Sequence, residues 1–135
     1  MYDTHRVSVK IAAYSSDANA VLIMLYGEDP DHPKAYGLPG GHIDGNEQPD
    51  EALERELQEE LGIKIDVFEH RDFFRKNHDG DLVLAYSAVV DGSIVMQPPH
   101  PEVERAVWMS RAEVEQLDAL FAYKDFILRN WPRKS

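Results

Sequence analysis

The chain has 135 residues, which suits one well-packed domain and is short for two, so we expect a single domain over residues 1–135. Its formal net charge of −11 argues against binding along a long nucleic acid, because that affinity comes from Lys and Arg displacing counterions. The sequence has no cysteine, which rules out disulfides and thiol chemistry and agrees with a reducing, cytoplasmic compartment.

Two apolar, β-branched runs at 5–14 and 20–26 flank a polar turn and predict a pair of strands. A short strand is expected at 36–38. The apolar runs at 20–26 and 82–90 are too short to cross a bilayer, and the N-terminus lacks a basic region followed by an apolar core. We therefore expect no membrane association.

The next segment, Gly37-Leu38-Pro39-Gly40-Gly41, offers backbone with few side chains. Such a loop lets a main-chain carbonyl approach a metal ion or a phosphate closely. Gly40 is the candidate for that carbonyl. Glycine pairs are also ordinary turn formers, so the loop alone does not separate a ligand site from a turn.

A helix is predicted over 49–61, because this stretch consists almost entirely of strong helix formers. Pro49 suits its first position since proline has no N–H to leave without a partner. Gly62 suits the end, where glycine can adopt the left-handed conformation that closes a helix. Both boundaries of the helix are therefore marked in the sequence.

Two stripes run along this predicted helix. Leucines recur every fourth residue and should pack on a core, at Leu53, Leu57 and Leu61. Three carboxylates form an adjacent stripe, at Glu56, Glu59 and Glu60. Like charges at this spacing cost about 0.2–0.5 kcal/mol per pair, a cost that a bound cation would reverse. Oxygen ligands without Cys or His favour Mg²⁺ or Mn²⁺ over Zn²⁺. The alternative is that the three carboxylates form a solvated acidic face without a ligand.

The second half of the chain mixes strands and helices without strict alternation. A strand at 64–76, a turn at 77–80 and a strand at 82–90 predict a hairpin. A proline-rich loop at 98–101 precedes extended structure at 106–109. Helices are expected after a capping box that begins at Ser110, and at 119–130. This order suggests a mixed sheet between helices.

Taken together, residues 41–63 resemble a complete Nudix box. The match consists of Gly41, five residues, Glu47, seven residues, and then Arg55-Glu56-Leu57-Gln58-Glu59-Glu60-Leu61-Gly62-Ile63. The resemblance implies an α/β/α sandwich with a mixed sheet, and hydrolysis of a diphosphate linkage in a nucleoside triphosphate or nucleoside diphosphate derivative. It also implies Mg²⁺ or Mn²⁺ as cofactor and a small nucleotide as substrate. A homodimer is common among such proteins.

The same resemblance suggests roles for individual residues. The metal ligands would be the Gly40 carbonyl and the carboxylates of Glu56, Glu59 and Glu60. Glu56 is also a candidate base, and Arg55 is similar to the arginine that holds the glutamates in position. Glu47 resembles the earlier box glutamate, whose contribution is secondary or structural. Glu102, or else Glu104, would supply a further base or ligand from the loop before the strand at 106–109.

Substrate contacts are less marked in the sequence. His42 lies inside the box and would face phosphate. Arg75, near the hairpin turn, would touch phosphate or ribose, although basic side chains at turns are commonly just exposed. Aromatic side chains that could stack on a base, or pack in the core instead, are Tyr36, Phe73, Phe74 and Tyr86.

Two other functions fit the resemblance less well. A Nudix-fold module that senses a nucleotide or binds a partner without turnover commonly lacks box glutamates, and here all of them are present. An isomerase of prenyl diphosphates on a related fold would need a reactive cysteine, and this chain has none.

Overall fold

The computed structural model describes residues 6–27, 35–76, 80–91, 104–118 and 122–133. The strands in these ranges are β1 (Val7–Ser15), β2 (Ala20–Tyr26), β3 (Ala35–Gly37), β4 (Gly40–His42), β5 (Glu69–Arg75), β6 (Leu82–Val90) and β7 (Glu104–Ser110). The helices are α1 (Pro49–Leu61), α2 (Arg111–Glu115) and α3 (Lys124–Arg129).

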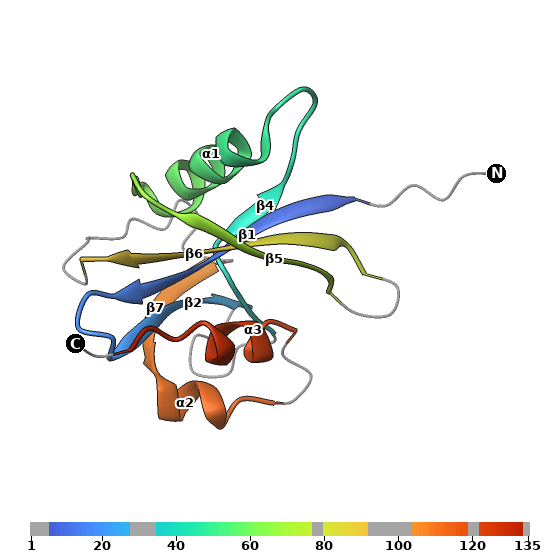
Figure 1. The fold of residues 1–135 in the computed structure, drawn as a ribbon. Coiled ribbons are helices and arrows are strands. Elements are labelled where there is room, and N and C mark those ends of the chain that lie inside the picture. Colours follow the sequence, from blue (N-terminus) through green and yellow to red (C-terminus); the bar gives the residue numbers. More distant parts are fainter. Residues whose placement is uncertain (1–5, 28–34, 77–79, 92–103, 119–121, 134–135) are drawn as a thin grey trace.

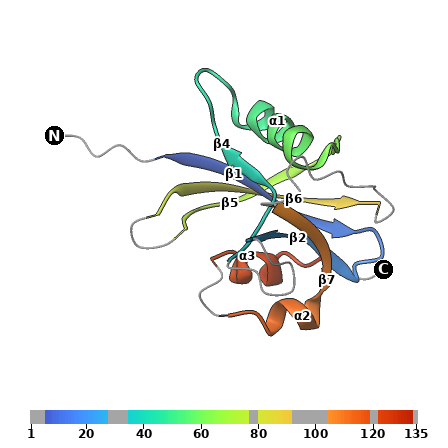
Figure 2. The ribbon, with the colours of Figure 1, turned by 180° about the vertical axis from the view of Figure 1, so that it is seen from behind.

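The strands form one mixed sheet that lies between helices. Its main path runs β3-β2-β1-β6-β5, while β4 pairs with β1 and β7 pairs with β2. The central pair of β1 and β6 is parallel, and the other pairings are antiparallel. Helix α1 covers one face of the sheet, and α2 and α3 lie against the other (Figures 1 and 2). This arrangement confirms the predicted α/β/α sandwich.

One edge of β1 is divided between two partners. Near its start, Ser8, Val9 and Lys10 pair with β4, whereas Tyr14 pairs with Val21 of β2. The chain therefore passes through the glycine-rich loop where β1 changes partner, and the N–H of Ile11 donates to the carbonyl of Pro39 at 3.1 Å. Because β4 and β2 pair with different parts of the same edge of β1, this loop is fixed beside the middle of β1.

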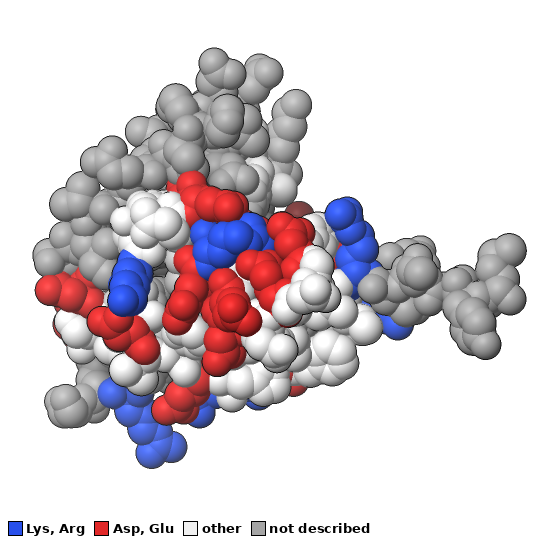
Figure 3. Space-filling view, turned by 90° about the horizontal axis from the view of Figure 1, so that it is seen from above, with Lys and Arg blue, Asp and Glu red and all other residues white. Residues whose placement is uncertain are grey.

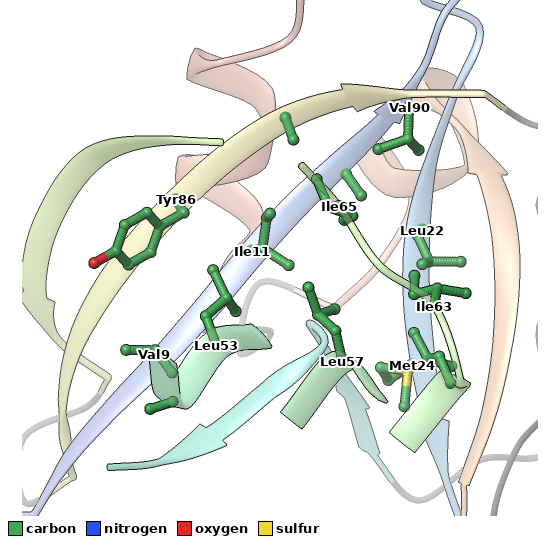
Figure 4. Close-up of a cluster of buried hydrophobic side chains, with 14 residues drawn as sticks. Val9, Ile11, Leu22, Met24, Leu53, Leu57, Ile63, Ile65, Tyr86 and Val90 are labelled. Atoms are coloured by element: carbon green, nitrogen blue, oxygen red, sulfur yellow. The ribbon is translucent and has the colours of Figure 1, made fainter. Parts of the chain in front are cut away.

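Helix α1 is held by the leucine stripe that the sequence predicts. Leu53, Leu57 and Leu61 are fully buried, and they pack against inward-facing residues of β1, β2 and β6 (Figure 4). Each buried leucine contributes about 1.5–3 kcal/mol relative to an exposed one. The helix ends at Gly62, which has φ 65° and donates its N–H to Gln58 O. These contacts orient the acidic stripe of α1 toward the glycine-rich loop.

A second core lies on the opposite face of the sheet, under α2 and α3. The buried hydroxyl of Tyr14 donates to the carbonyl of Ile127 at 2.6 Å. Tyr36 and Phe74 pack against this core and Tyr86 lies in the core under α1, so three of the four candidate base stackers serve packing. Phe73 is 52% exposed on β5.

Some elements of the structure differ from the prediction. The short strand β4 was not expected, because its residues Gly40–His42 carry no strand pattern. Strand β5 begins at Glu69 rather than at residue 64. Helix α3 spans Lys124–Arg129, which is shorter than the predicted 119–130, and residues 119–121 lie outside the described ranges.

No helix in the described part of the chain has both the length and the apolar character needed to span a membrane.

Candidate active site

Gly40 lies where two backbone segments approach each other closely. Its φ is +136°, and a Cβ at this position would lie 1.9 Å from the carbonyl oxygen of Val9. Its N–H donates to Oε1 of Glu60 at 2.8 Å. Glu60 is buried, with 9% exposure, so this bond fixes one carboxylate of α1 against the loop. Only glycine fits here.

Gly41 forms the floor beneath the carboxylate of Glu56. A Cβ on Gly41 would lie 2.4 Å from both Cδ and Oε1 of Glu56. Burial raises the pKa of the Glu56 carboxyl, while the positive charges of Arg55 and Lys10 partly offset this effect. Glu56 is therefore a partly desolvated carboxylate that rests directly on the backbone of the glycine loop.

Arg55 holds several oxygens at once. It binds Glu47 through two hydrogen bonds, of 2.8 and 3.1 Å, and its Nη1 donates to Glu56 and Glu59 at 3.1 Å each. Its Nη2 also donates to the backbone carbonyl of His42 at 3.1 Å. In the view onto the α1 side, basic surface is enclosed by acidic side chains (Figure 3). The guanidinium thus cross-links the loop, the start of the box and the acidic stripe.

The pairing with Arg55 also changes the pKa of Glu47. The hydrogen bond from Arg55 holds the pKa of the Glu47 carboxyl below its usual range, and the backbone N–H of Asp44 adds to this effect. Glu47 therefore stays ionised and anchors Arg55.

The three glutamates of the acidic stripe lie in different surroundings. Glu56 and Glu59 share Nη1 of Arg55, while Glu60 turns inward to Gly40. Across the described ranges, no three His, Asp or Glu side chains are grouped closely enough to hold a metal ion as they stand. The donors around the loop are nevertheless all oxygens, and Glu60 is already oriented by the Gly40 N–H. This donor chemistry fits a hard divalent cation.

His42 makes a close pair with a residue outside the box. Its Nε2 lies 2.6 Å from Oδ2 of Asp81, just before β6. Beside it is a pocket of about 400 Å³, lined by Arg6, Val7, His42, Ile43 and Asp44. The structure thus places His42 at the wall of this pocket, with one ring nitrogen fixed by the Asp81 carboxylate.

One further predicted residue, Arg75, is not brought to this site. Arg75 lies on the outer strand β5, where it pairs with Leu82 of β6. Strands β6 and β1 therefore lie between Arg75 and β4, which carries His42. Glu102 lies outside the described residues, and so does the side chain of Glu104.

Lys10 also lies at this candidate site, although it is far from residues 41–63 in the sequence. Its Nζ donates to the carbonyls of Leu38 and Gly40, at 3.3 and 3.4 Å. A signal was present in the sequence, because Lys10 is the single charged residue of an otherwise apolar or small-residue strand, VSVKIAAYS. A charge at such a position needs polar partners, and here the loop carbonyls supply them.

Comparison with known proteins identifies the family and the fold. The NUDIX domain family matches residues 4–129. The chain is 28% identical over 127 residues to the NAD-capped RNA hydrolase NudC of Deinococcus radiodurans, covering 84% of this chain and 45% of that protein. It is 47% identical over 36 residues to an 8-oxo-dGTP diphosphatase of Haemophilus influenzae, covering 27% of this chain and 26% of that protein. The chain thus spans less than half the length of these curated relatives.

Among solved structures, the fold is similar to the NUDIX domain of Shewanella oneidensis NrtR, determined in complex with ADP ribose. The TM-score is 0.77 at 20% identity, covering 95% of this chain and 87% of that one. A likeness at this identity shows the fold. The family match over residues 4–129, together with the complete box built around Arg55, shows that the chain belongs to the Nudix family.

Proposed function

We propose that this protein is a pyrophosphohydrolase that cleaves a diphosphate linkage in a nucleoside triphosphate or a nucleoside diphosphate derivative. The observation that carries the proposal is the network around Arg55, which gathers Glu47, Glu56 and Glu59 beside the glycine-rich loop. Every side chain that the box resemblance marks as functional is present in this network or contacts the loop directly.

The proposed cofactor is Mg²⁺ or Mn²⁺. Glu56, Glu59, Glu60 and the Gly40 carbonyl would hold it, with Glu102 as a further ligand or base. A divalent ion in such a site neutralises charge on the diphosphate and lowers the pKa of a bound water. With a net charge of −11, the protein itself would repel a polyanionic substrate, so a cation between the two is electrostatically favourable.

The protein's own residues supply positioning and proton transfer. Arg55 fixes Glu56 and Glu59 relative to the loop, and its anchor Glu47 keeps the guanidinium in place. Glu56 is the candidate base, because burial raises its pKa and a more basic carboxylate accepts a proton from water more readily. His42, with Nε2 held by Asp81, offers its other ring nitrogen to a phosphate oxygen when protonated.

The substrate class is supported by what similar proteins are named for. An NAD cap, 8-oxo-dGTP and ADP ribose each contain a nucleoside joined to a diphosphate. We therefore place the diphosphate at the acidic stripe and the glycine-rich loop. The acidic surface makes a long nucleic acid an unfavourable ligand.

The second candidate is a nucleotide-binding module without turnover. It shares the fold and the ligand class, so only catalysis distinguishes the two. The complete set of box glutamates favours the enzyme, because modules of this fold that only bind a ligand commonly lack some of them.

The test combines a substrate screen with two variants. Purified protein with Mg²⁺ or Mn²⁺ is assayed against nucleoside triphosphates, sugar nucleotides and dinucleotides, and released monophosphate or pyrophosphate is followed. We expect Glu59→Gln and Glu60→Gln to remain folded and to lose turnover by about 10²–10⁴-fold. In Glu60→Gln the amide oxygen still accepts the Gly40 N–H bond, which preserves the loop.

Glu54→Gln is the matched control, since Glu54 is an exposed acid on the same helix. It should retain turnover. Near-normal turnover in both Glu59→Gln and Glu60→Gln would contradict the proposed function. Tight nucleotide binding without release of any product would favour the binding module.

A further inference from the structure

Lys10 places a positive charge within a largely apolar strand. Its neighbours Val9 and Ile11 are fully buried, and Lys10 itself is partly buried. The register of β1 with β4 sets Lys10 opposite Gly40. The strand pairing, rather than a chance side-chain conformation, therefore brings the lysine to the glycine-rich loop.

The ammonium group of Lys10 contacts the proposed metal site itself. Nζ donates to the Gly40 carbonyl at 3.4 Å and to the Leu38 carbonyl at 3.3 Å. Its charge also acts on Glu56, whose carboxylate rests on Gly41 next to that carbonyl. Lys10 thus makes polar contact with one proposed metal ligand and an electrostatic contact with another.

The ammonium group of Lys10 and a divalent ion would compete for the position beside the Gly40 carbonyl and Glu56. Mg²⁺ lies about 2.0–2.1 Å from its oxygen ligands, so an ion held by the Gly40 carbonyl and Glu56 would come close to Nζ if Lys10 stayed in place. Two positive charges at a few ångströms in a partly desolvated site repel each other more strongly than they would in water. Lys10 must therefore move, or weaken the binding of the ion.

We propose that Lys10 is a competing cation of the free protein: its ammonium group binds the Gly40 carbonyl and offsets the negative charge of Glu56, and a divalent ion must displace it. This inference rests on the proposed function, because it takes the Gly40 carbonyl and Glu56 as metal ligands. It assigns to β1, which lies outside the box, control over how tightly the free protein binds its ion.

The test measures Mn²⁺ binding to the whole chain without nucleotide, by titration calorimetry or by the electron paramagnetic resonance signal of free Mn²⁺. We expect Lys10→Met and Lys10→Gln to bind Mn²⁺ more tightly than the wild type, with a Kd lower by on the order of tenfold. Lys10→Arg keeps the charge and should bind like the wild type.

Lys64→Met controls for the change in overall charge. The Lys64 side chain is 78% exposed and pairs with Asp66, away from the loop, so this variant should match the wild type. An equal gain in affinity in Lys64→Met would attribute the effect to net charge and overturn the inference. Thermal melting of each variant reports whether it is folded. Two neutral replacements of Lys10 are used so that the test still stands if one of them does not fold.

The remaining outcomes separate this inference from the proposed function. Unchanged or weaker Mn²⁺ binding in both neutral Lys10 variants, with binding lost in Glu59→Gln, would overturn the role of Lys10 and leave the metal site standing. Absence of Mn²⁺ binding in every variant and in the wild type would overturn both.

Discussion

Gly40 and Gly41 are adjacent, but each must lack a side chain for a different reason. At Gly40 the obstacle is backbone, since a Cβ would meet the Val9 carbonyl of β1 at 1.9 Å and the φ of +136° disfavours other residues. At Gly41 the obstacle is the carboxylate of Glu56, which is the end of a side chain and can move. The first glycine therefore serves the fold, and the second serves the site.

Replacement of Gly41 by alanine tests this distinction. We expect Gly41→Ala to fold, because only the Glu56 side chain needs to shift, but to lose turnover by about 100-fold, since misplacement of a reactive group by about 1 Å has an effect of that size. The measurements are kcat with Mg²⁺ and the thermal midpoint of unfolding.

Gly45→Asn is the control for this substitution. Gly45 has a φ of +50° with nothing within 4 Å of a Cβ, and asparagine tolerates that conformation. It should keep normal turnover. Full activity in Gly41→Ala would show that the position of Glu56 against the loop does not matter for the reaction.

At the residue scale, the sequence predicted which side chains share a helical face but not how each is used. Periodicity places Glu56, Glu59 and Glu60 near one another, because helical neighbours recur every three or four residues. It does not indicate that Glu60 turns inward to the Gly40 N–H, or that Lys10 reaches the same loop. Both contacts depend on the pairing of β1 with β4, which joins segments far apart in the chain.

At the scale of elements, helix α1 was predicted with both boundaries correct. The reason is local chemistry, since Pro49 opens the helix and Gly62 closes it in the left-handed conformation, at φ 65°. Strand β4 was not predicted, because its three residues pair only through the tertiary register with β1. Elements whose ends are set by their own residues can be read from sequence, and elements defined by a distant partner cannot.

The C-cap of α1 leads to a stability prediction. Gly62→Ala should lower the free energy of unfolding by about 1 kcal/mol, because a Cβ is disfavoured in the left-handed conformation. The bond from the Gly62 N–H to Gln58 O is retained if the backbone holds. Urea unfolding measures the change, with Glu54→Ala on the exposed face as a control expected within about 0.5 kcal/mol of the wild type. Equal stability of Gly62→Ala and the wild type would mean that the helix end relaxes without cost.

At the scale of the whole molecule, Tyr14 joins the sheet to the C-terminal helix. Its buried hydroxyl donates to Ile127 O at 2.6 Å, and its ring meets Trp131 edge-on at 5.2 Å between centroids. Burial raises the pKa of the Tyr14 phenol above its usual range and raises that of Tyr123 to about 12. Both side chains are therefore kept neutral in the core under α3.

The raised tyrosine pKa values predict a loss of stability in alkali. The unfolded chain releases these protons near pH 10, whereas the folded chain retains them, so the free energy of unfolding should fall as pH rises above about 10. Tyr14→Phe should cost about 1 kcal/mol at pH 8 through the lost hydrogen bond and should show a shallower alkaline decline. Urea unfolding at pH 8, 10 and 11 measures both effects. An unchanged alkaline slope in Tyr14→Phe would assign the decline to other groups.

The parallel pairing at the centre of the sheet has a consequence for how the chain is made. Strand β1 lies between β2 and β6, and its partner β6 follows only after more than half of the sequence. On the ribosome, β1 and β2 emerge with their apolar faces uncovered and wait until later segments are synthesised. Because such distant pairings form late, the first half of the chain exposes apolar surface that can aggregate until β6 has been made.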